Sequence, residues 1–85
     1  MPREERRITR WAIEWRSKTL LEGERRRFMW DGYRPLLFGT REEAREAIKA
    51  SWGYIAERKD LRREPHGWRM PRPVLVEVIL RRREP

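Results

Sequence analysis

The chain has 85 residues with 22 basic and 14 acidic side chains, a formal charge of +8, and it contains no cysteine and one histidine. That length allows a single small domain, which buries only about 60% of the surface of its unfolded chain. The absence of cysteine excludes disulfides and thiolate metal sites. A lone histidine argues against a metal centre or a catalytic dyad, so we expect no metal, no cofactor and no enzyme.

Arginine dominates the positive charge and supplies 19 of the 22 basic residues. Arginine forks onto phosphate and carboxylate groups, which indicates a partner rich in such groups. The alternative is a GC-rich genome, in which arginine codons replace lysine codons without selection for binding. No apolar run approaches the roughly 20 residues of a membrane span. The start of the chain has no signal-peptide pattern, so we expect a cytoplasmic protein.

Two stretches in the first part of the chain have the alternation of β-strands. From Ile8 to Arg16, the residues Trp11, Ile13 and Trp15 fall on one side, which is the expected core face. A second strand is predicted from Arg25 to Trp30.

A turn and two further strands are predicted around the centre and near the end of the chain. Asp31 and Gly32 indicate the turn. Residues 33–38 are a candidate short strand, weakened by Pro35, whose nitrogen cannot donate a ladder hydrogen bond. Val74 to Leu80 alternates again and is the predicted last strand.

One amphipathic helix is predicted from Gly39 to Arg58. Thr40 is the expected N-cap, and Glu43 completes a capping box three residues later. Apolar and small residues then recur at the spacing of one helical face. The members of this stripe are Ala44, Ala47, Ile48, Ser51, Trp52 and Ile55.

The order strand, strand, helix, strand predicts a two-layer α+β fold. We expect a three-stranded antiparallel sheet, with the first strand between the second and the last, packed on one helix. Residues 1–85 form one small domain in this prediction. Residues 1–7 and 81–85 are expected to be flexible, and residues 58–73 are expected to form a long basic loop, of a length that is often functional or disordered.

Two groups of residues are candidates for binding. On the sheet face away from the helix, Arg10, Arg16 and Arg27 would lie among small apolar side chains. That face is either a partner surface or an ordinary solvent-exposed face covered by arginine stems. The second group lies in the basic loop and consists of Arg62, Arg63, Trp68 and Arg69.

The loop residues also allow two interpretations. Bases can stack on Trp68 while arginines neutralise phosphates, as in proteins that bind single strands. Alternatively, Trp68 closes the core over one helix end and the charges are solvated. His66 has no nucleophile near it in the sequence, and the chain has no phosphate-binding glycine motif, so we expect binding rather than catalysis.

The segment Leu37-Phe38-Gly39-Thr40-Arg41-Glu42-Glu43-Ala44 resembles small phage and mobile-element proteins with the order strand, strand, helix, strand. The resemblance implies a DNA-binding accessory factor or an inhibitor of host defence, such as an anti-CRISPR protein. It implies no individual functional residue.

Two functions therefore follow as expectations. The first is a basic module that binds DNA or RNA through phosphates. The second is a phage-type inhibitor or adaptor whose partner is a host protein with an acidic or nucleic-acid-binding surface.

Overall fold

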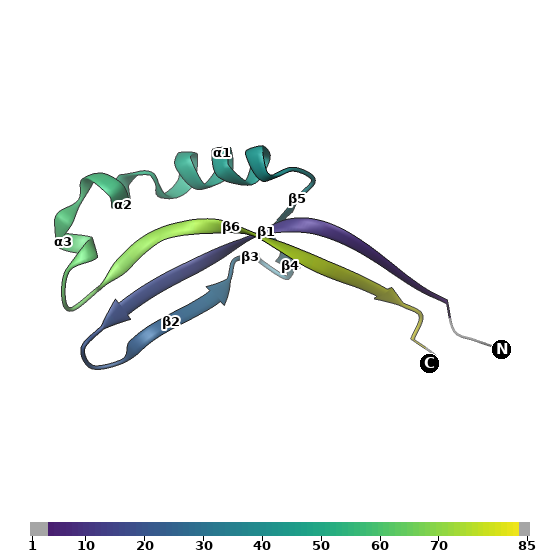
Figure 1. Ribbon diagram of the computed structural model, residues 1–85, viewed down its shortest axis with the longest axis horizontal. Helices are drawn as coiled ribbons and strands as arrows, with labels where there is room; N and C mark the ends of the chain where they lie inside the picture. The colour runs from purple at the N-terminus through teal and green to yellow at the C-terminus, as the bar shows by residue number, and fades with distance from the viewer. Residues whose placement is uncertain (1–3, 84–85) are drawn as a thin grey trace.

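The computed structural model describes residues 4–83, and two long antiparallel strands form its axis (Figure 1). β1 (Glu5–Thr19) and β6 (Trp68–Arg81) pair along nearly their whole length, with one bulge between Glu14 and Arg16. The molecule measures 56 × 29 × 20 Å and has a radius of gyration of 16.3 Å. A compact chain of this length would have a radius of about 12 Å. The protein is therefore elongated along the β1–β6 pair.

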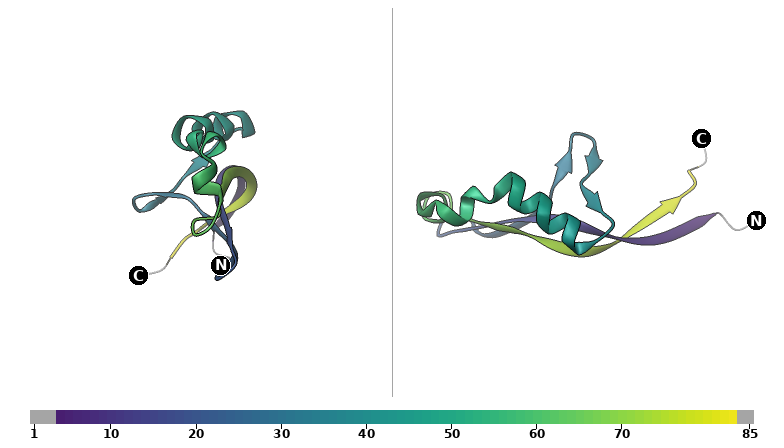
Figure 2. Two further views of the ribbon diagram at one scale, coloured as in Figure 1. Left: turned by 90° about the vertical axis from the view of Figure 1, so that its left-hand side faces the viewer. Right: turned by 90° about the horizontal axis from the view of Figure 1, so that it is seen from above.

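Shorter strands extend the sheet beyond the other edge of β1. β2 (Gly23–Phe28) pairs antiparallel with residues 14–19, and β5 (Leu37–Phe38) pairs with residues 11–12. β3 (Trp30–Asp31) and β4 (Arg34–Pro35) form a separate two-stranded sheet. Figure 2 shows this small hairpin projecting sideways from the main sheet.

The helices form a single layer over one face of the sheet (Figure 1). They are α1 (Arg41–Trp52), α2 (Tyr54–Glu57) and α3 (Lys59–Arg62). Arg41 of α1 stacks over the ring of Trp11 at 5.8 Å, which identifies the face of β1 that the helices cover. The fully buried residues Ile13, Ala44 and Ile55 form the centre of the core between the two layers.

The predicted cap of the first helix is confirmed. The amide of Glu43 donates to the side-chain oxygen of Thr40 at 3.1 Å, an interaction that stabilises a helix by about 1 kcal/mol. The predicted single helix is interrupted at Gly53, where α1 ends, and again at Arg58. Glycine has a low helix propensity, and the chain bends here to continue along the sheet.

The predicted α+β fold, with a three-stranded sheet packed on one helix, was wrong. Of the residues that the structure describes, 51% are in strands and 25% in helices, and the main sheet has four strands. β1 and β6 span 15 and 14 residues, beyond the stretches whose side chains alternate cleanly. At both ends of the strand pair, the backbone groups of charged residues form hydrogen bonds to the partner strand. A sequence pattern of alternating apolar and polar side chains cannot predict strand pairing in such charged stretches.

The stretches expected to be loop or flexible ends are partly regular. In 58–73, α3 occupies Lys59–Arg62 and β6 begins at Trp68, so the connection is shorter than expected. Of the expected flexible ends, residues 5–7 and 81 belong to β1 and β6. The expectation for residues 1–3 and 84–85 lies outside the described residues.

The far end of the long strand pair consists of two strands only. We call residues 5–10 of β1 with residues 76–81 of β6 the ribbon, because β2 and β5 pair with β1 only from residue 11 onward. Within residues 4–83, no helix is long and apolar enough to cross a membrane.

Candidate functional site

Basic side chains gather at the end of the sheet opposite the ribbon. A hollow of about 540 Å³ is lined by Lys18, Thr19, Leu20, Arg62, Arg63, Glu64 and Arg69. An adjoining hollow of about 410 Å³ is lined by Arg16, Ser17, Lys18, Glu24 and Arg69. The two hollows share Lys18 and Arg69 and so form one surface. We call its five cationic residues the basic end: Arg16, Lys18, Arg62, Arg63 and Arg69.

Strand pairing and one tight connection bring these residues together. Arg16 of β1 lies opposite Arg69 of β6. The amide of Lys18 donates to the carbonyl of Gly67 at 2.8 Å, which anchors the chain that follows α3. Gly67 has φ of 60°, and a Cβ at this position would overlap the carbonyl oxygen of Lys18. Only glycine allows this close approach without strain.

A second contact fixes the end of α3, where Arg62 and Arg63 lie. The amide of Leu20 donates to the carboxylate of Glu64 at 2.7 Å. This bond joins the turn after β1 to the segment after α3, and it uses one of the two carboxylates that line the hollows. The loop arginines are thereby placed beside Lys18.

The charge at the basic end is only partly compensated. Within the described chain, Lys18, Arg62 and Arg69 make no ion pair. The second lining carboxylate, Glu24, bonds Arg26 at 2.6 Å, and this hydrogen bond lowers the pKa of Glu24 below its ordinary value. Five cations therefore share the surface with two carboxylates that already have partners.

Arg16 and Arg63 are held by backbone carbonyl groups. A terminal nitrogen of Arg16 donates to the carbonyl of Met70 at 2.9 Å, next to the bulge, and Nε of Arg63 donates to the carbonyl of Lys59 at 3.3 Å. The Nε of Arg16 is buried and has no partner among residues 4–83. Arg16 is half-buried, so it contributes charge from beneath the more exposed cations.

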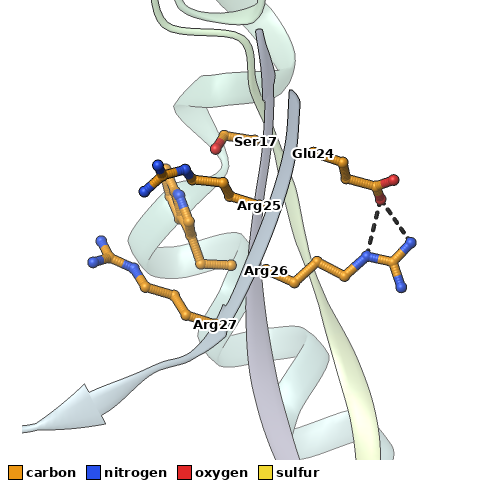
Figure 3. Close-up of a pocket in the computed structure, with 6 residues that line it drawn as sticks. Ser17, Glu24, Arg25, Arg26 and Arg27 are labelled. Atoms are coloured by element: carbon orange, nitrogen blue, oxygen red, sulfur yellow. Dashed lines mark hydrogen bonds and ion pairs between the residues drawn. The ribbon is translucent and has the colours of Figure 1, made fainter. Parts of the chain in front are cut away.

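The prediction that Arg27 shares a face with Arg10 and Arg16 was wrong. Arg27 lies opposite Trp15, and Figure 3 shows it on the same side of β2 as Arg25, whereas Arg26 points to the other side. Successive side chains of a strand alternate between faces. Trp15 and Arg16 are neighbours, so Arg27 is on the face opposite Arg16. It lines a hollow of about 620 Å³ beside Trp15 that does not include any residue of the basic end.

Arg10 lies far from the basic end. It is six residues from Arg16 along β1, which corresponds to about 20 Å of strand. A terminal nitrogen of Arg10 donates to the carbonyl of Thr9 at 2.7 Å. The structure thus brings together Arg16, Arg62, Arg63 and Arg69, and leaves Arg10 and Arg27 apart.

Trp68 is engaged in packing. Its ring meets Trp15 edge to face, with centroids 5.3 Å apart and planes at 73°, and it also contacts His66 at 5.3 Å. The side chain is half-buried at the start of β6. This arrangement agrees with the interpretation in which Trp68 closes one end of the core.

Lys18 is the member of the basic end that the sequence analysis missed. It lies beyond Arg16, where the first strand was predicted to end, but β1 continues to Thr19. The signal was the alternation of Glu14, Arg16 and Lys18, which places Lys18 on the same face as Arg16.

Apart from Arg10, the arginines of the ribbon have acidic partners, in contrast to those of the basic end. Arg7 pairs with Glu5 at 3.0 Å and with Glu77 at 3.4 Å, and Arg81 pairs with Glu5 at 3.2 Å. Beyond the ribbon, Glu4 accepts from Arg82 at 3.3 Å. The two ends of the sheet therefore differ in charge compensation although both are rich in arginine.

Across residues 4–83, no cluster of three or more His, Asp or Glu residues could hold a metal ion. No protein-family model, curated protein or solved structure matches the chain.

Proposed function

We propose that the protein is a small nucleic-acid-binding module whose basic end contacts phosphates. The observation that carries this proposal is the convergence of five cations from β1, α3 and β6 on one surface, with only two engaged carboxylates beside them. Arginine and lysine neutralise phosphates and release counterions, which supplies most of the affinity of sequence-independent binding. DNA or RNA is the partner we propose, in the cytoplasm.

The contrast between the two ends supports selection for binding over codon bias. Codon bias gives no reason for arginines to be ion-paired in the ribbon region and largely unpaired at the basic end. Trp68 is committed to the core, so base stacking at the basic end has little support. Contacts to the phosphate backbone fit these long, exposed side chains better than readout of bases.

The test is a salt titration of binding to duplex and single-stranded oligonucleotides. With about five phosphates neutralised on duplex DNA, the logarithm of affinity should fall against the logarithm of salt with a slope of about −4.5. The double variant Arg62→Ala/Arg63→Ala removes two contacts and should reduce the steepness of the slope by about 1.8. Its fold should be retained because both side chains are exposed.

A matched control removes two charges from another surface. Arg45 and Lys49 lie on the exposed side of α1 and make no ion pair within the described residues. Arg45→Ala/Lys49→Ala changes net charge equally and should leave the slope nearly unchanged. Equal effects of the two double variants would show that net charge alone drives binding. Absence of binding at micromolar protein and low salt would exclude the module and leave an acidic host protein as the partner to test.

A further inference from the structure

The outer edge of β6 is unpaired. Among the described strands, β6 pairs only with β1, so no strand covers its other edge. In the part beside the helices, Pro71 and Pro73 lack an amide hydrogen, and a bulge lies next to them. Both features prevent regular pairing of this part of the edge with another strand. From Val74 to Arg81 the register with β1 is regular and the sequence contains no proline. Such an edge is a template for another strand.

The backbone groups that point outward can be identified from the ladder. The carbonyl of Ile13 accepts from the amide of Met29, so the backbone of Ile13 points away from β6, and that of Pro73 opposite it points away from β1. Antiparallel pairs alternate between hydrogen-bonded and non-hydrogen-bonded positions. The outward amides and carbonyls are therefore those of Leu75, Glu77, Ile79 and Arg81.

The side chains along this edge are apolar with one charge of each sign. Leu75 is 56% exposed, Ile79 45% and Leu80 58%. Glu77 and Arg81 flank Ile79 on the same face of the strand, two residues to either side. Their ion pairs with Arg7 and Glu5 leave more than half of each side chain accessible.

We propose that this edge joins two copies of the protein through antiparallel pairing of β6 with β6 of a second copy. In the proposed register, Ile79 lies opposite Ile79 of the second copy. Glu77 then lies opposite Arg81 of the second copy, and the twofold symmetry repeats this pair on the other side of the axis. Every outward amide meets an outward carbonyl, because residues 77, 79 and 81 occupy hydrogen-bonded positions in both chains.

Charge complementarity and the central apolar contact together select this register. A shift of two residues places Glu77 opposite Ile79 in one direction, which loses both charge pairs. The shift in the other direction places Arg81 opposite Ile79 and Glu77 opposite Arg83. Both shifts lose the central contact between the two Ile79 side chains, and apolar pairs across strands are favourable. The interface is small, so we expect a reversible dimer of micromolar affinity. This inference does not depend on nucleic-acid binding.

Amide hydrogen exchange tests the edge with an internal control. In the monomer, the amides of Glu77, Ile79 and Arg81 have no partner and exchange rapidly, whereas those of Val78 and Leu80 bond to β1. In the dimer, all five are protected. Protection of residues 77, 79 and 81 should therefore rise with protein concentration, while that of residues 78 and 80 should not change. Rapid exchange of residue 79 at every concentration would overturn the proposal.

Charge reversal tests the register. In Glu77→Arg, two arginines oppose each other at each site, and in Arg81→Glu two glutamates do so. Each variant alone should have a dimer dissociation constant about tenfold higher than the wild type. An equal mixture of the two variants restores opposite charges at both sites and should form a heterodimer.

The readout is the molar mass in solution, with circular dichroism to confirm that each variant is folded. At the same total concentration, the average mass of each separate variant should lie closer to the monomer mass of 10.6 kDa than the average mass of the mixture does. A wild type that stays monomeric at millimolar concentration would overturn the proposal. A dimeric wild type whose variants do not recover on mixing would overturn the register.

Discussion

The two ends of the β1–β6 pair carry similar numbers of arginines and use them differently. In the ribbon, Arg7 pairs with Glu77 and Arg81 pairs with Glu5 on the neighbouring strand. At the basic end, Lys18, Arg62 and Arg69 have no acidic partner among the described residues. Exposed ion pairs add little stability, but they cancel the field that a phosphate would meet. Net charge alone therefore does not locate a binding site, because compensation by neighbours decides which cations remain available.

The largest loss of stability is expected from a substitution in the core beneath the helices, between the two ends of the strand pair. Ile13 is fully buried in the middle of β1. Ile13→Ala should lower the free energy of unfolding by about 2–5 kcal/mol, through lost burial and the cavity left behind. Urea unfolding followed by circular dichroism measures the change. An unchanged midpoint would mean that the helices do not pack on this part of the sheet.

Gly67→Ala should disrupt the basic end selectively. A left-handed backbone conformation and overlap with the carbonyl of Lys18 should together cost about 2–4 kcal/mol. Gly32→Ala is the matched control, because Gly32 has φ of 62° but nothing lies near its Cβ position. It should cost about 1 kcal/mol. Equal costs for the two variants would show that the contact between Gly67 and Lys18 is not tight.

Removing arginines that are already ion-paired should change both stability and nucleic-acid binding only slightly. This variant therefore tests the difference between the ribbon region and the basic end. Arg6 and Arg82 both lie near Glu4, at 3.7 and 3.3 Å. Arg6→Ala/Arg82→Ala should change the free energy of unfolding by less than about 0.5 kcal/mol. It should also reduce the salt slope of nucleic-acid binding less than Arg62→Ala/Arg63→Ala does. A larger reduction of the salt slope than in Arg62→Ala/Arg63→Ala would indicate that nucleic acid binds near the ribbon.

The smallest expected change is in the pKa of Glu24, whose carboxylate lies beside the basic end. The hydrogen bond and charge of Arg26 lower the pKa of Glu24 below its ordinary value of 4.5. A lowered pKa in the folded state contributes stability above pH 4.5 that is lost as the pH falls through the folded value. Arg26→Ala should raise the pKa of Glu24 toward 4.5, as measured by carbon NMR titration of its carboxyl group. An unchanged titration would mean that the ion pair does not form in solution.

Local sequence patterns predicted the parts of the molecule that local physics controls. The N-cap Thr40, one half of the predicted capping box, placed the start of α1, because its side-chain oxygen accepts from the amide of Glu43 three residues later. The arginines at 62, 63 and 69 were also candidates from charge alone. The limits of β1 and β6 were missed because the ladder continues over charged residues such as Glu5 and Arg81, where no alternation marks a strand.

The sequence by itself determined the charge of the protein, the absence of cysteine chemistry, the capped helix and the apolar stripe that packs on the sheet. The tertiary structure alone decided which cations meet and which are compensated. Lys18 lies beside Arg62 because Gly67 lets the segment after α3 approach β1. Arg27 lies on the face opposite Arg16 because it pairs with Trp15, and successive side chains of a strand point to opposite faces. Ion pairing and convergence depend on contacts between residues distant in the chain, and these are fixed only when the strands pair in one register.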